Sequence, residues 1–128
     1  MGHIISAYID DTINIGDDFL DCANNVADTI KLLDKLGFCI HPIKSLFTPT
    51  QEIIFLGFIL NSRNMTIRVT KKKMDDIQDL GNNLLSTAPT IRLLASFLGK
   101  ITATFPGVRY GPLFYRNLER NKTRALQM

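Results

Sequence analysis

The chain has 128 residues, a net charge of +3, 45% apolar residues and a mean hydropathy of +0.07. This composition allows one compact domain, or one domain with an appendage, and excludes a disordered chain. The longest apolar stretch, residues 53–60, is far shorter than the roughly 20 residues of a membrane helix, and the N-terminus lacks a signal-peptide pattern. We therefore expect neither a membrane protein nor a secreted one, and no targeting signal decides between cytoplasm and nucleus.

The N-terminal segment predicts a β-hairpin with two acids at its tip. Residues 4–8 form a short apolar run, and residues 12–15 alternate with a period of two. Asp10 and Asp11 lie between these two runs. Two short strands joined by a tight turn are the simplest structure for this pattern.

Residues 18–36 predict an amphipathic helix that packs on a sheet. Asp17 or Asp18 can cap its start, because a short side-chain oxygen accepts a hydrogen bond from an unpaired backbone N–H. Gly37 is well placed to end it. The apolar positions recur at steps of four and three: Phe19, Ala23, Val26, Ile30 and Leu33.

Three more strands are expected, at residues 38–40, 53–60 and 65–69, and the polar residues 61–64 predict the turn between the last two. The rest of the chain predicts helices, which start at Thr70, Thr90 and Pro112 and are interrupted at residues 86–89 and 105–107.

Strands with one packed helix, followed by helices only, indicate an α+β fold with an antiparallel sheet. We expect a subdomain boundary near residue 69, which gives segments 1–69 and 70–128.

The charge is distributed unevenly along the chain. Residues 1–62 carry eight acids against three bases, a net charge of −5, whereas residues 63–128 carry twelve bases against four acids, a net charge of +8. One interpretation is an ordinary solvated basic face. The other is an acidic patch that holds cations beside a basic segment that follows phosphates. Charge alone does not choose between them.

The adjacent Asp10 and Asp11 are either turn residues or a cation site. Two unit charges about 4 Å apart repel by roughly 1 kcal/mol in water, which a turn tolerates. Rigid strands on either side would hold both carboxylates in place, and Mg²⁺ prefers such oxygen ligands. A calcium loop starting at Asp10 is excluded, because it would need an acid or amide in place of Thr12 and glycine in place of Ile15.

Tyr8-Ile9-Asp10-Asp11 between two apolar strands resembles the Y-x-D-D signature of reverse transcriptases, the RNA-directed DNA polymerases. Later segments follow the order of that family. Residues 36–38 with 41–45 resemble the next palm segment and its lysine, and residues 55–58 resemble the primer-grip hairpin. Residues from 71 onward stand where the thumb begins. Residues 91–120, with their Phe-Pro-Gly and Gly-Pro-Leu segments, resemble the connection of retrotransposon polymerases, with the tyrosine-recombinase-bearing (DIRS-like) group as one candidate.

The resemblance implies a two-metal nucleotidyl-transfer site. Asp10 would ligate Mg²⁺ or Mn²⁺, with Asp11 as second ligand or local support, and Tyr8 would lie near the primer terminus. Lys44 would contact the triphosphate or protonate pyrophosphate, or else it is a plain surface lysine. The residues implied to hold the primer backbone are Phe55, Leu56 and Gly57, of which Phe55 could equally pack in the core. Those implied to follow duplex phosphates are Arg68, Lys71, Lys72 and Lys73.

The resemblance also implies partners: an RNA or DNA template with a primer, a dNTP, the fingers, an earlier palm strand with a further aspartate, and in some polymerases an RNase H-like domain. Only nine residues precede Asp10. We therefore expect this chain to be a fragment that is inactive by itself. Two other hypotheses stay open, namely a non-catalytic nucleic-acid-binding module that uses the basic half, and a structural remnant with neither role.

Overall fold

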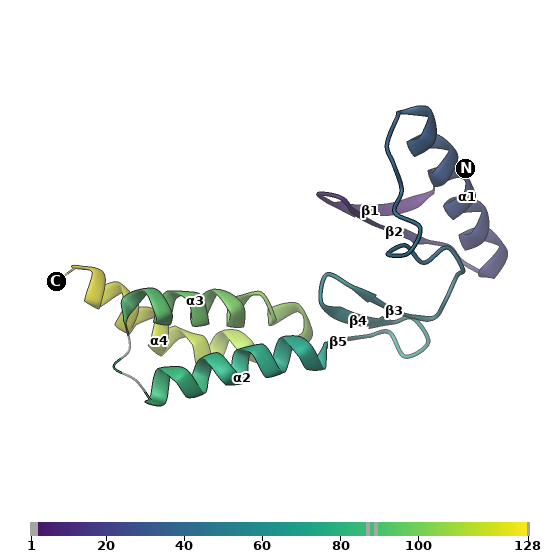
Figure 1. The fold of residues 1–128 in the computed structure, drawn as a ribbon. Coiled ribbons are helices and arrows are strands. Elements are labelled where there is room, and N and C mark those ends of the chain that lie inside the picture. Colours follow the sequence, from purple (N-terminus) through teal and green to yellow (C-terminus); the bar gives the residue numbers. More distant parts are fainter. Residues whose placement is uncertain (1–2, 87, 89, 128) are drawn as a thin grey trace. The chain divides into compact units, whose positions relative to one another are not determined.

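The computed structural model describes residues 3–86, 88 and 90–127, and the chain has an α+β fold (Figure 1). The elements in chain order are β1 (Ile4–Tyr8), β2 (Asp11–Ile15), α1 (Phe19–Lys35), β3 (Glu52–Phe55), β4 (Phe58–Asn61), β5 (Thr66–Val69), α2 (Lys71–Ser86), α3 (Ile91–Thr102), the 3₁₀ turn η1 (Phe105–Gly107) and α4 (Gly111–Gln127). None of the described helices is both long and apolar enough to cross a membrane.

The chain divides into two compact units, residues 1–56 and 57–128, which we call the N-terminal and the C-terminal unit. The subdomain boundary expected near residue 69, where the predicted strands give way to helices, stays a prediction. The division into compact units lies earlier in the sequence, within the turn that joins β3 to β4.

The N-terminal unit contains the predicted hairpin. β1 and β2 pair antiparallel as a two-stranded sheet, with Ile4 opposite Ile15 and Tyr8 opposite Asp11. Only Ile9 and Asp10 lie between the strands. The expected hairpin is therefore confirmed, with Asp10 in the turn and Asp11 as the first residue of β2.

Both ends of α1 are formed by the residues that the sequence indicates. The Asp18 side chain accepts a hydrogen bond from the Asp21 N–H at 2.8 Å, which satisfies one unpaired donor of the first turn. At the other end the Phe38 N–H donates to the Leu33 carbonyl, and the Gly37 N–H donates to the Asp34 carbonyl. These two bonds form a Schellman motif, with Gly37 in the left-handed region at φ +81°.

The buried face of α1 differs from the predicted apolar stripe. Its buried residues are Asn25 and Thr29, whereas Phe19 is 64% exposed. The Asn25 side-chain amide donates to the Ile15 carbonyl at 2.8 Å, and the Thr29 hydroxyl donates to the Asn14 side chain at 2.8 Å. The helix packs on β2 as predicted, and Ala23, Val26 and Leu33 of the predicted stripe are half-buried, whereas Phe19 and Ile30 are exposed.

Two strand predictions are wrong. Residues 38–40 have no strand partner and follow α1 as irregular chain. The apolar run 53–60 forms two strands, because Leu56 and Gly57 both have positive φ, 52° and 78°, and reverse the chain. Positive φ at both central residues is the geometry of a type I′ turn. The three-stranded sheet has the order β3-β4-β5.

The C-terminal unit consists of the β4–β5 hairpin and three helices, in which α3 packs against both α2 and α4 (Figure 1). Leu98 of α3, 1% exposed, is the most deeply buried apolar side chain in the described part of the unit. Thr90 caps α3 as predicted by accepting a hydrogen bond from the Leu93 N–H. The break expected at residues 86–89 lies partly outside the described residues. The last helix starts at Gly111, one residue before the expected Pro112.

The hairpin and the helices of this unit meet at η1, where the sequence predicts a loop. An added Cβ at Gly107 would lie 2.9 Å from Val69 Cγ2 and 3.2 Å from both Phe58 Cδ1 and the Val69 backbone nitrogen. Phe58 and Val69 are paired across β4 and β5, so both face Gly107 from the same side of the hairpin. The missing side chain of Gly107 therefore allows the hairpin to pack closely on the connection to α4.

We predict opposite effects for alanine at two glycines of this unit. Gly107→Ala should lower the free energy of unfolding by about 1–3 kcal/mol, because the new methyl overlaps Val69. Gly99→Ala should raise it by about 1 kcal/mol, because this site lies in α3 with nothing within 4 Å of the added Cβ. Urea titrations of both variants measure the difference. Equal effects would contradict the proposed packing at η1.

Candidate functional site

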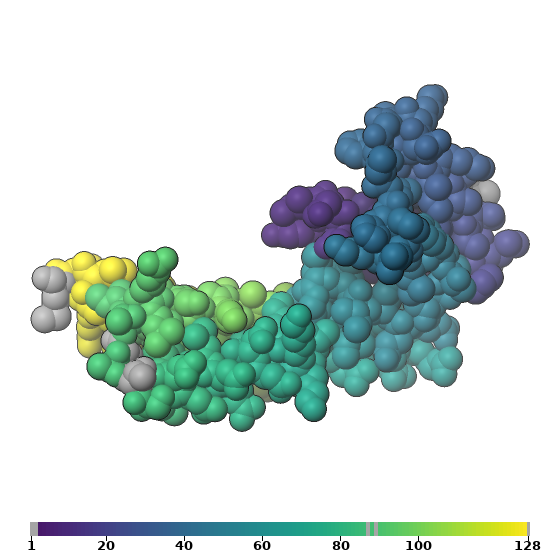
Figure 2. All heavy atoms as spheres, in the orientation of Figure 1, coloured from purple at the N-terminus to yellow at the C-terminus, as the bar shows by residue number. Residues whose placement is uncertain are grey.

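The candidate site is the tip of the β1–β2 hairpin, whose two-residue turn holds strained backbone. Ile9 has φ 55°, a left-handed conformation that β-branched residues rarely adopt. Its side chain is 87% exposed, and Tyr8 beside it is 58% exposed. Asp10 and Asp11 are exposed as well. Figure 2 shows this hairpin, in purple, with its tip open to solvent. The turn thus presents two adjacent carboxylates and an aromatic ring together.

The two faces of the hairpin have different surroundings. Side chains alternate between faces along a strand, and residues paired across strands share a face. Asn14 faces α1, because its side-chain oxygen accepts a hydrogen bond from the Thr29 hydroxyl. Tyr8 and its partner Asp11 lie on the opposite face. This second face also contains Ile4 and Ile15, which are 61% and 49% exposed. Asp11 therefore shares a face with Ile4 and Ile15, which pair at the other end of the hairpin, and this face is opposite the one that contacts α1.

The turn offers two carboxylates as oxygen donors for a hard divalent cation. Within residues 3–86, 88 and 90–127, no three His, Cys, Asp or Glu side chains are grouped so that they could hold a metal ion. Magnesium binding at the tip therefore stays a prediction, in which substrate phosphates or another carboxylate would supply further ligands.

A second group of acids, Asp17, Asp21 and Asp28, lies just before α1 and along its first ten residues, and two of these acids accept hydrogen bonds through their side chains. Asp28 accepts from His3 at 3.1 Å and from Lys31 at 3.5 Å. Asp21 accepts from the backbone N–H of Asp17 at 3.1 Å. These acids line a shallow depression beside Asn25. Their contacts are those of helix capping and surface ion pairs, so the tip of the hairpin remains the stronger cation candidate.

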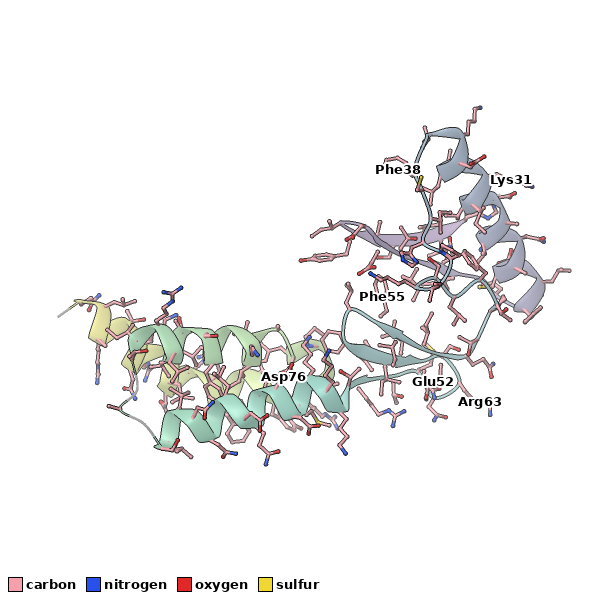
Figure 3. All side chains as sticks on the ribbon, in the orientation of Figure 1. Lys31, Phe38, Glu52, Phe55, Arg63 and Asp76 are labelled. Atoms are coloured by element: carbon pink, nitrogen blue, oxygen red, sulfur yellow. The ribbon has the colours of Figure 1, made fainter. Side chains whose placement is uncertain are left out.

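Lys44 and the residues implied for primer binding lie in turns or at strand ends. Lys44 is exposed in the turn at residues 42–44. A hydrogen bond from the Ser45 N–H to the His41 carbonyl spans this turn. Phe55 ends β3 (Figure 3), and Leu56 and Gly57 form the turn after it. Phe55 is half-buried, and Leu56 is 40% exposed. Their roles toward a primer stay predictions.

The basic residues implied for phosphate binding have unequal surroundings. Arg68 is exposed on β5, and Lys71 and Lys72 are exposed in the first turn of α2. Lys73 is half-buried, and its ammonium donates to the Ala103 carbonyl at 3.0 Å. The first turn of α2 contains no acid. Lysines at a helix N-terminus oppose the helix dipole, so this run is not explained by helix stability.

A row of arginines on α4 was missed by the sequence reasoning. Arg116, Arg120 and Arg124 recur at steps of four, so they line one face of the helix. All three are exposed, and none has an ion-pair partner in the described part of the chain. Like charges at this spacing destabilise a helix slightly. The i, i+4 arginine pattern was the signal available in the sequence.

Lys122 on the same helix has a different role. Its ammonium lies 2.7 Å from Glu119 Oε1. The hydrogen bond from Lys122 lowers the pKa of Glu119, and the pairing raises the pKa of Lys122. Because its charge is neutralised locally, Lys122 does not extend the arginine row.

We predict that glycine at position 9 stabilises the N-terminal unit. Left-handed backbone costs a residue with a Cβ about 1–2 kcal/mol, and glycine's greater loss of entropy costs about 0.5–1 kcal/mol. Ile9→Gly should therefore raise stability by up to about 1 kcal/mol, since the exposed side chain packs little. Ile9→Ala keeps a Cβ and should give no gain. Thermal denaturation of both variants tests this, and equal gains would contradict strain at Ile9.

Comparisons of the chain with family models, with curated proteins and with solved structures found no significant match. A functional assignment therefore depends on the hairpin tip, on the basic surface of the C-terminal unit and on the order of the segments between them.

Proposed function

We propose that this chain supplies the metal-binding turn and the primer-holding part of an RNA-directed DNA polymerase. In this proposal residues 1–69 are the C-terminal part of the palm, and residues 70–128 are the thumb and connection. The reaction is template-directed transfer of a nucleotide to a primer 3′ end. The chain contributes only part of the metal site, and fingers and a further palm aspartate complete it from outside these 128 residues.

One observation carries the proposal most strongly, namely the antiparallel hairpin that presents two adjacent acids at an exposed tip. Backbone strain persists where surrounding structure enforces it, and it is concentrated at functional sites. The positive φ of Ile9 does not by itself distinguish this turn, because Leu56 and Met65 have it in the turns that follow β3 and β4. The residues beside Ile9 are those of the Y-x-D-D signature.

In the proposed mechanism, Asp10 and Asp11 orient a divalent cation at the end of a rigid hairpin. Such a cation, when bound, would neutralise the charge that develops on the attacking and leaving oxygens. Tyr8 lies on the same face as Asp11, and in this proposal it would contact the primer terminus. Lys44 would contact the triphosphate of the incoming nucleotide. Leu56 and Gly57 would hold the primer backbone, since the absence of a side chain at Gly57 allows close approach.

The exposed basic residues support binding to a nucleic-acid backbone. Lys71 and Lys72 lie at the N-terminus of α2, where backbone N–H groups and the helix dipole also attract anions. The arginine row of α4 adds three exposed cations at a repeat of about 6 Å along the helix axis. Contacts of this kind follow phosphates without reading sequence.

The same basic surface favours a second candidate function, a nucleic-acid-binding module without catalysis. Under that alternative, the carboxylates of the turn have no part in any reaction. The two candidates differ in one respect that can be measured: only the polymerase needs Asp10.

We predict that Asp10→Asn abolishes primer extension by a polymerase in which these residues lie within a complete palm and fingers. Loss of one metal ligand removes several kcal/mol of transition-state stabilisation, a decrease on the order of 100-fold or more. Asp34→Asn is the matched control, because Asp34 is an exposed acid in the last turn of α1 that has no part in the proposed metal site, and it should leave extension unchanged. Near-normal extension by Asp10→Asn would leave the binding module as the better proposal.

We also predict that the 128-residue chain binds a template–primer duplex with an affinity that falls steeply with salt. Arg120→Gln should reduce the slope of log K against log salt by about 0.7–0.9, the contribution of one phosphate contact. Lys35→Gln, which removes an exposed cation from α1, should leave the slope unchanged. Fluorescence anisotropy at four or more salt concentrations gives both slopes. An unchanged slope for Arg120→Gln would remove α4 from the interface.

A further inference from the structure

We propose that Lys73 is a positioning residue that fixes Gly57 and Phe58 against the helices of the C-terminal unit, and that it does not bind phosphate. This inference rests on the proposed function, because Gly57 belongs to the segment that resembles the primer grip. It separates Lys73 from its neighbours Lys71 and Lys72, with which it shares one basic run.

Three contacts of the Lys73 side chain point inward. Its Nζ donates to the Ala103 carbonyl at 3.0 Å and lies 4.2 Å from the centroid of the Phe58 ring. Its stem covers Gly57, where an added Cβ would lie 3.2 Å from Lys73 Cδ and 3.5 Å from Nζ. One side chain thus joins the start of β4, the first turn of α2 and the end of α3.

Each of these contacts has a physical reason to persist. Ala103 is the C-cap of α3, and the carbonyls at a helix end lack partners and attract cations. The face of the Phe58 ring attracts the same ammonium. A lysine ammonium has three N–H donors and no acceptor. The Ala103 carbonyl uses one of these donors and the Phe58 ring attracts the same charge, so the half-buried Lys73 ammonium is held at the junction, whereas Lys71 and Lys72 are exposed.

A backbone hydrogen bond completes the junction. The Thr70 N–H donates to the Gly57 carbonyl at 3.2 Å. Thr70 immediately precedes α2, and its hydroxyl accepts from the Lys73 N–H. The position of Gly57 relative to α2 thus depends on the hydrogen bond from Thr70 and on the Lys73 side chain that covers Gly57. Through Gly57 and Phe58, Lys73 would set the place of a primer held at this turn.

The test compares Lys73→Met with Lys72→Met in the 128-residue chain. Methionine keeps an unbranched stem and removes the charge and the donors. Hydrogen exchange of the Thr70 amide reports the junction, and anisotropy against a template–primer duplex at several KCl concentrations reports phosphate contacts. Lys73→Met should speed hydrogen exchange of the Thr70 amide by about tenfold. It should lower the affinity for the duplex by a factor that does not change with KCl concentration, so the salt slope stays the same. Lys72→Met should leave Thr70 exchange unchanged and reduce the slope by about 0.7–0.9.

Lys73→Arg is the rescue variant, because arginine restores a cation and N–H donors, and it should return Thr70 exchange to within about threefold of the original chain. A reduced salt slope for Lys73→Met with unchanged Thr70 exchange would overturn the proposal, as would a failure of Lys73→Arg to restore protection. If no variant binds template–primer, the proposed function fails, and Thr70 exchange still decides whether Lys73 fixes the junction.

Discussion

Both units bury little apolar surface. The folded structure of each unit therefore depends on tight turns, helix caps and a few specific contacts. Among the described residues, only Val69 and Leu98 are buried apolar side chains. α1 is held on β2 through Asn25 and Thr29, and the β4–β5 hairpin is held on η1 where Gly107 leaves room for Val69. Large exposed apolar faces are expected of a protein that packs against further structure. The open face beside Tyr8 is such a surface, and in the proposed polymerase substrate or further palm structure would cover it.

Local signals in the sequence predicted the ends of the helices better than their faces. Asp18, Gly37 and Thr90 act through hydrogen bonds to neighbouring residues, so their roles follow from sequence spacing. The buried face of α1 depends on which side chains can reach Asn14 on β2, and hydrophobic periodicity does not contain that information. The turn at Leu56 and Gly57 interrupts an apolar run in which only the glycine signalled a reversal.

The candidate site was predictable in part. The adjacency of Asp10 and Asp11 and their place at a hairpin tip follow from the strand pattern, whereas the left-handed backbone of Ile9 does not. The distribution of charge along the sequence identified the basic half, but it could not show which of its lysines and arginines face solvent and which make contacts within the protein. Lys73 contacts Ala103 and Phe58, whose positions depend on how the hairpin meets the helices. Tertiary packing thus decides which cations face solvent.

Paramagnetic line broadening by Mn²⁺ in the 128-residue chain tests whether the hairpin tip is a divalent-cation site. If it is, the amide signals of Ile9, Asp10 and Asp11 should broaden at a lower Mn²⁺ concentration than those of Asp21 and Asp28, whose oxygens already accept hydrogen bonds. Asp10→Asn should abolish this preference. Equal broadening at both groups of acids, or earlier broadening at Asp21 and Asp28, would contradict a metal-binding turn.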